Sequence, residues 1–81
     1  MGYDAGMVTV LQAAGMRFVI HTDDHEPAHV HVYGDGEARI DITEVAAIST
    51  RRMSKRDLAR ALTIVVENRQ LLRNRWRELH E

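Results

Sequence analysis

A histidine-rich stretch holds the residues best suited to chemistry, because four of the five histidines lie within eleven residues, among carboxylates. His29 and His31 stand two positions apart in an alternating segment. In a strand both would point to one face, with Cα atoms about 6.5–7 Å apart. His25 lies in the preceding loop and could fold back over that face. With Asp24, these three imidazoles form a ligand set suited to a divalent transition metal, and zinc is our first expectation.

The same histidines allow two further interpretations. Imidazoles with a pKa near the ordinary value of about 6.5 work as acid and base without a metal. One would then activate the 2′-hydroxyl of RNA while another protonates the leaving group. In the second interpretation the histidines are structural and hydrogen-bond the loop carboxylates. His25 to His29 also reads His-Glu-x-x-His, but we reject a zinc-protease motif because Pro27 argues against the helix that it requires.

The elements that would position these residues form a predicted α+β fold, a small antiparallel sheet packed against a helix. Segments of alternating apolar and polar residues, separated by turn residues, predict about four strands joined as hairpins in a meander. Residues 43–50 fit either a short fifth strand or a turn of helix. We expect one domain over residues 1–81, with the sheet over about 7–49. The expected strands cover residues 7–11, 16–22, 29–33 and 37–42.

The spacing of apolar residues changes near residue 54, where one long C-terminal helix is predicted to begin and to continue to about residue 80. Ser54 and Asp57 form a variant of the capping box that starts helices. Asn68, a weak helix former, marks where this helix would break. A helix of about 25 residues measures about 38 Å and would overhang strands of about 17–24 Å. We therefore expect a homodimer or a partner protein to cover its end, which carries Leu71, Leu72, Trp76 and Leu79.

Charge is divided unevenly along the chain. Residues 1–50 carry eight acidic and two basic residues, whereas residues 51–81 carry nine basic and four acidic ones. Either an acidic sheet meets a basic helix, or the basic half binds an anionic partner such as nucleic acid. A helix N-terminus attracts phosphate, so the candidates for anion binding are the four bases near residue 54. They are Arg51, Arg52, Lys55 and Arg56.

Composition excludes several classes of protein. The chain has no cysteine, so a disulfide framework and a thiol nucleophile are excluded. No apolar run approaches the about 20 residues that a transmembrane helix needs. The first residues lack the basic and apolar regions of a secretory signal, so we expect a cytoplasmic protein without a membrane partner.

The segment from Asp24 to Val32 reads Asp-His-Glu-Pro-Ala-His-Val-His-Val. It resembles the signature of a family of small bacterial proteins known as domain of unknown function 4160. The resemblance continues through residues 37–42 and ends in a helix that carries Trp76. One departure is Ala28, where the family usually has a second proline, and this change loosens the loop without removing a histidine.

The resemblance implies a functional context but no reaction. Members of this family are often encoded beside another small protein, in arrangements that resemble toxin–antitoxin modules. Its signature residues in this chain are His25, His29 and His31.

Three functions follow as hypotheses. In the first, the chain is one component of a two-protein module and acts by binding its small partner and nucleic acid. In the second, the three signature histidines make it a ribonuclease or phosphodiesterase toxin. In the third, the same histidines bind a metal in a regulatory domain. Whether the chain is an enzyme stays open on the sequence alone.

Overall fold

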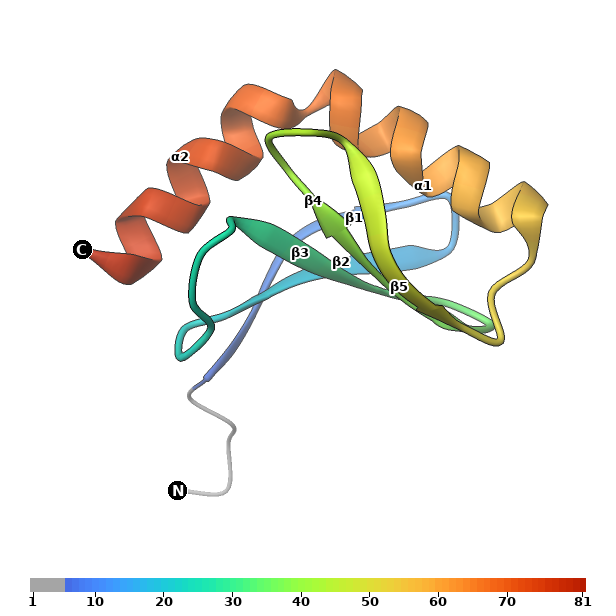
Figure 1. The fold of residues 1–81 in the computed structure, drawn as a ribbon, viewed down its shortest axis with the longest axis horizontal. Coiled ribbons are helices and arrows are strands. Elements are labelled where there is room, and N and C mark those ends of the chain that lie inside the picture. The colour runs from blue at the N-terminus through green and yellow to red at the C-terminus, as the bar shows by residue number, and fades with distance from the viewer. Residues whose placement is uncertain (1–5) are drawn as a thin grey trace.

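The computed structural model describes residues 6–81 and shows one antiparallel sheet with two helices across one of its faces (Figure 1). Each strand pairs with the next in the chain, so the strand order is β1-β2-β3-β4-β5. This is the α+β meander that the sequence predicts. The strands are β1 (Met7–Ala13), β2 (Met16–His21), β3 (His29–Tyr33), β4 (Glu37–Asp41) and β5 (Ala46–Arg51). The helices are α1 (Lys55–Glu67) and α2 (Arg69–His80).

The tight turns follow from glycine and from local backbone conformation. Ala14 and Gly15 join β1 to β2 with φ angles of 55° and 75°, the two positive values that a type I′ hairpin turn requires. Gly36 lies in the β3–β4 turn, where a Cβ would stand 2.2 Å from the carbonyl oxygen of Arg52. The absence of a side chain there lets the segment leading to α1 cross the turn.

The alternation of each strand separates the sheet into a covered face and an open face. The covered face packs against α1 and α2 and forms the hydrophobic core. The opposite face carries polar side chains, among them His31, Tyr33 and Arg39. This open face is where the candidate chemistry lies. The core consists of Met16, Phe18, Ile20, Val30, Val32, Ala38, Ile40, Ile42, Ala61, Ile64, Val65, Leu72 and Trp76.

The structure makes the prediction more specific at two places in the fold. Residues 46–51 form a fifth strand, which resolves the ambiguity over residues 43–50 and replaces the expected count of about four strands. The long helix is divided at Asn68, where a break was expected, and the Asn68 side chain donates to the carbonyl oxygen of Ile64 at 2.8 Å. This bond competes with the helical backbone pattern, so the chain changes direction there. Ser54 begins α1 as predicted and accepts from the amide of Asp57 at 3.0 Å.

The bend at Asn68 keeps the second helix on the sheet. Leu72 is fully buried and Trp76 is 5% exposed, so both belong to the core of the chain itself and not to an outer surface. Leu71 is 45% exposed, and Leu79 is partly buried against the core. Of the four residues expected at an interface, Leu71 is therefore the most accessible. Neither helix in the described part of the chain combines the length and the apolar character needed to cross a membrane.

Candidate metal centre on the open face of the sheet

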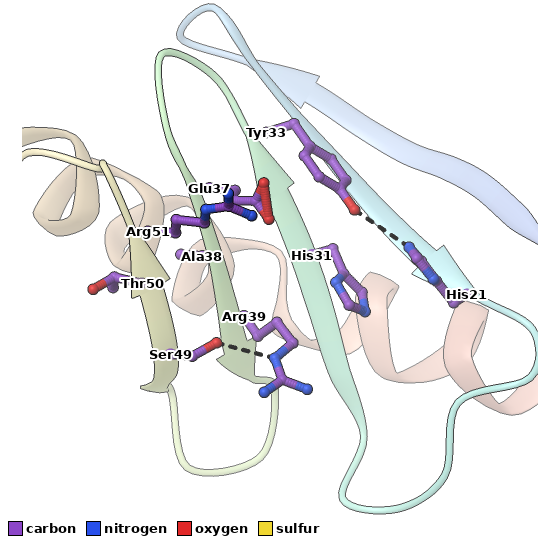
Figure 2. A pocket seen from close by; sticks show the side chains of 9 residues that line it. All are labelled: His21, His31, Tyr33, Glu37, Ala38, Arg39, Ser49, Thr50 and Arg51. Atoms are coloured by element: carbon purple, nitrogen blue, oxygen red, sulfur yellow. Dashed lines mark hydrogen bonds between the residues drawn. The ribbon is translucent and has the colours of Figure 1, made fainter.

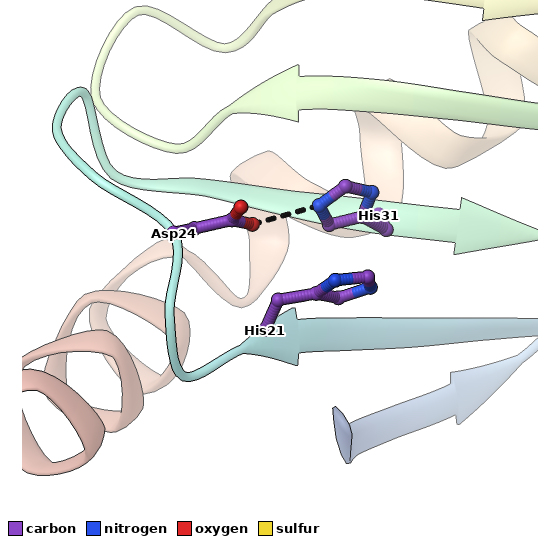
Figure 3. A group of neighbouring side chains, drawn as sticks. All are labelled: His21, Asp24 and His31. Atoms are coloured by element: carbon purple, nitrogen blue, oxygen red, sulfur yellow. Dashed lines mark hydrogen bonds and ion pairs between the residues drawn. The ribbon is translucent and has the colours of Figure 1, made fainter. Parts of the chain in front are cut away.

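Three histidines reach one carboxylate region at the junction of β2, β3 and the loop between them. His21 ends β2, His29 begins β3, and His31 follows two residues later on the same face. Asp24 lies in the connecting loop, where its amide donates to the carbonyl oxygen of His21 at 3.2 Å. This bond turns the loop back, so the Asp24 side chain meets the strand histidines (Figure 3).

One oxygen of Asp24 is shared by two imidazoles. Asp24 Oδ2 lies 2.8 Å from Nε2 of His31 and 3.0 Å from Nε2 of His29. The His31 contact is a hydrogen bond, and because a carboxylate only accepts, Nε2 of His31 donates. The His29 contact is close but lacks hydrogen-bond geometry, so this nitrogen has no hydrogen-bond partner.

The orientation of His29 is fixed from its other side. Its Nδ1 lies 2.8 Å from the carbonyl oxygen of Pro27, which can only accept, so Nδ1 donates. In the neutral ring Nε2 then carries the lone pair, and it faces Asp24. The residue is 6% exposed, and the Trp76 ring packs beside it at 5.4 Å between centroids. A buried lone pair aimed at a carboxylate oxygen is unfavourable unless a cation or a proton lies between them.

His21, the last residue of β2, completes the group. Its ring stacks on that of His31, with 3.9 Å between centroids and 21° between planes. The Tyr33 hydroxyl lies 3.4 Å from its Nε2. Potential ligand atoms of His21, Asp24 and His31 all lie within 4.8 Å of one another. We call these three residues and His29 the histidine–aspartate cluster.

Electrostatics in the cluster favour an ionised Asp24 beside a neutral His31. Partial burial raises the pKa of Asp24, but the His31 hydrogen bond and the charges of three histidines outweigh it, so the net pKa is lowered. Burial lowers the pKa of His31, and His21 and His29 lower it further, against the opposing effect of Asp24. Near neutral pH, His31 is therefore a neutral donor to a charged Asp24.

The spacing of the polar atoms fits a single metal ion. Zinc binds histidine nitrogen and carboxylate oxygen at about 2.0–2.2 Å, so two ligands of one ion stand about 3 Å apart. Each of the two nitrogens lies at this distance from Asp24 Oδ2, and an ion bound there would take the place of the proton between His31 and Asp24. The Nδ1 bond from His29 to Pro27 is also typical, since metal-binding histidines usually donate their second nitrogen to a carbonyl or carboxylate. The potential ligand atoms of His21, Asp24 and His31 lie close enough together to hold one ion, and His29 adds a nitrogen 3.0 Å from the same carboxylate oxygen.

A pocket of about 540 Å³ lies beside the cluster on the same open face (Figure 2). His31 pairs across the sheet with Arg39, which in turn pairs with Ser49 on β5. Arg39 Nε donates to Ser49 Oγ at 3.0 Å. The pocket is lined by His21, His31, Tyr33, Glu37, Ala38, Arg39, Ser49, Thr50 and Arg51.

The structure brings together three of the four expected metal ligands. Asp24, His29 and His31 converge, whereas the side chain of His25 is exposed and makes no hydrogen bond or ion pair within residues 6–81. His21 was not among the predicted ligands. Its signal was the alternation of β2, which places residue 21 on the same face as residue 19, the residue that pairs with His31.

The structure spreads the four predicted anion-binding residues over neighbouring positions at the start of α1 and the end of β5. Arg51 lines the pocket beside the cluster, and Arg51 and Arg52 together line a neighbouring hollow of about 310 Å³. Lys55 and Arg56 are exposed at the start of α1. Sequence reasoning missed Arg39, although its alternation with Ala38 and Ile40 indicates a side chain on the open face.

Comparison with known proteins identifies a family but no close relative of known function. The family model described as "Domain of unknown function (DUF4160)" matches residues 15–77, which include both strands and the loop of the cluster. No curated protein and no solved structure matches the chain. The match covers most of the chain and confirms the resemblance seen in the histidine signature. The chain belongs to the DUF4160 family.

Proposed function

We propose that the protein binds one divalent transition-metal ion through Asp24, His29 and His31 and uses it as a Lewis acid. The observation that carries this proposal is the buried Nε2 of His29, which has no hydrogen-bond partner and faces the carboxylate oxygen that His31 also contacts. A cation at this point would satisfy the lone pair and the carboxylate together. We expect zinc first, since its common ligands are imidazole and carboxylate groups.

The position of the cluster supports a reactive centre more than a purely structural one. Structural zinc sites usually have four protein ligands, whereas catalytic sites have three and keep a position for water or substrate. Asp24 and His31 are partly exposed and stand beside an open pocket. Water bound by such an ion ionises near pH 7, so hydrolysis is the reaction class that this arrangement favours.

The test is metal content by elemental mass spectrometry on protein purified without a histidine tag or a chelator. We expect about one zinc per chain in the wild type and in His25→Ala, whose exposed ring lies outside the cluster. His29→Ala should lose the metal. Because His29 is buried, His31→Ala serves as a second variant at a partly exposed position.

Two results of this measurement would overturn the metal proposal. Wild-type protein that stays metal-free after incubation with zinc would overturn the proposal and return the cluster to metal-free acid–base or structural roles. Equal metal content in wild type, His29→Ala and His31→Ala would also overturn it, because the ion would then be bound elsewhere.

Association with a small cytoplasmic partner, as in a toxin–antitoxin-like module, is a second candidate function. The observation favouring it is β5, an edge strand whose six residues are all exposed. An exposed edge offers unpaired backbone groups to which another chain can add a strand. Co-expression with the product of the neighbouring gene should yield a complex in size-exclusion chromatography. Separate elution of both proteins would contradict this function, and elution of the chain alone as a dimer would support the expected homodimer.

A further inference from the structure

We propose that the open-face pocket binds a phosphodiester, with Arg39 holding the phosphate beside the metal centre. The proposal rests on the proposed function, because the metal supplies the second contact to the phosphate. It goes further by naming the substrate class and a residue that selects it.

The first argument is position. Two rows of paired residues run across the sheet beside the cluster. In one row His31 stands next to Arg39, and directly paired residues have Cβ atoms about 4.5–5.5 Å apart. A long arginine side chain and a metal held by His31 can therefore reach oxygens of the same phosphate. Figure 2 shows both side chains on the face that forms the pocket.

The second argument is hydrogen-bonding capacity. Arg39 uses Nε to donate to Ser49, which fixes the guanidinium, and its two terminal nitrogens make no hydrogen bond or ion pair within residues 6–81. A planar guanidinium with free donors matches two phosphate oxygens at once. The hydroxyls of Ser49 and Thr50 line the same wall of the pocket and offer further donors.

The third argument is charge. The pocket is lined by two arginines, Arg39 and Arg51, and by one carboxylate, that of Glu37. Glu37 stands opposite Arg51 in the register of β4 and β5. The protein side therefore carries one excess positive charge, and a diester carries one negative charge per phosphate. A volume of about 540 Å³ is in the range of pockets that hold small molecules of nucleotide size.

The reaction is the addition of water across the diester. The water oxygen forms a bond to phosphorus, one ester P–O bond breaks, and the leaving oxygen takes up the proton that water releases. No electron is transferred, and no further reactant is needed. Arg39 stabilises the negative charge that grows on the phosphoryl oxygens.

The experiment measures hydrolysis of bis(p-nitrophenyl) phosphate by the zinc-loaded protein. We expect Arg39→Ala to lower kcat/KM by about tenfold to hundredfold, as for loss of a charged hydrogen bond, with zinc content unchanged. Arg39→Lys should recover part of the activity, since it keeps the charge but not the planar donors. The matched control is Arg60→Ala, which removes one exposed arginine from α1 on the other side of the sheet and should act as wild type.

A second arm identifies the source of the diester. A fluorescent single-stranded RNA of about ten nucleotides is titrated in parallel and followed by anisotropy and by gel. Cleavage of the RNA with little turnover of the small diester assigns the pocket to a nucleic-acid strand. Efficient turnover of the small diester alone assigns it to a small phosphodiester. In both cases the Arg39→Ala defect supports the proposal.

Two results would overturn the inference, and each differs from a failure of the metal proposal. Zinc-loaded protein that neither binds nor hydrolyses either probe excludes the phosphodiester. Equal activity in wild type and Arg39→Ala, with equal zinc content, excludes the role of Arg39. If the wild type binds no metal, the proposed function fails, and Arg39-dependent binding of the RNA still tests the pocket by itself.

Discussion

The orientation and tautomer of His29 follow from the surroundings of its two ring nitrogens. Pro27 accepts from Nδ1, so the tautomer is set, and Nε2 is left facing Asp24 in a buried position. His31 is set by its hydrogen bond to the same carboxylate. The neighbouring His25 has the same chemistry but is exposed, which makes it the natural control for every histidine substitution.

At this scale we predict that the metal-free protein loses stability as pH falls below about 6.5. The pKa of His31 is lowered in the folded chain, so between 6.5 and its folded pKa the unfolded chain binds more protons. Stability present above 6.5 is therefore lost on acidification through this range. Asp24, with its lowered pKa, adds a further loss below 3.8, and His21 and His29 are the other titrating groups that face His31.

The measurement is the melting temperature of chelator-treated protein from about pH 8 to about pH 5. His31→Gln should flatten the decline near pH 6, while His25→Gln should leave it unchanged. An identical decline in His31→Gln and wild type would show that His31 does not cause it.

The positions of the two helices follow from the sheet against which they pack. Asn68 divides them where a straight helix would leave the curved sheet, and Arg69 anchors the start of α2 by donating to the carbonyl oxygens of Ile42 and Thr43. Trp76 then packs beside His29 and donates to Glu26 at 3.2 Å. The second helix thereby supports the back of the histidine–aspartate cluster.

We predict that two adjacent leucines of α2 differ strongly in their effect on stability. Leu72→Ala should lower the free energy of unfolding by about 2–5 kcal/mol, because Leu72 is fully buried. Leu71→Ala should change it by less than about 0.5 kcal/mol, because Leu71 is largely exposed. Urea denaturation measures both values. A large cost for Leu71→Ala, together with a change in elution volume, would instead identify this helix face as an interface.

For the whole molecule, the division of charge does not produce ion pairs between sheet and helices. Within residues 6–81, one ion pair involves a lysine or an arginine. It joins Arg75 to Glu78 inside α2. The basic side chains of the helices are therefore mostly solvated. The small size of the domain makes its stability modest, so a bound ion should have a large effect.

We predict that zinc raises the melting temperature of the whole protein. At a free concentration about 100 times Kd, binding stabilises a folded protein by about 2.7 kcal/mol, which for a small domain corresponds to about 10–20 °C. Differential scanning calorimetry with and without zinc measures the shift. His29→Ala should show little shift, and magnesium should serve as the control ion because it prefers oxygen ligands. The same melting curve with zinc and with a chelator would argue against a metal centre.

The sequence by itself determined four of the five strands, the hairpin turns, the start of α1 and the histidine signature. These depend on local rules, because alternation defines strands, glycine permits tight turns, and Ser54 caps a helix through a residue three positions away. The sequence also indicated His29 and His31, since two residues two positions apart share a face of a strand.

Only the tertiary structure decided which other groups join those histidines. His21 and Arg39 reach the site through strand pairing, a loop bond brings in Asp24, which the sequence had indicated, and the side chain of His25 is exposed outside the cluster. Likewise, the burial of Leu72 and Trp76 depends on a bend that brings α2 onto the sheet. Spacing along the chain specifies which way a side chain faces, whereas distances between elements depend on register and packing, which involve the whole chain at once.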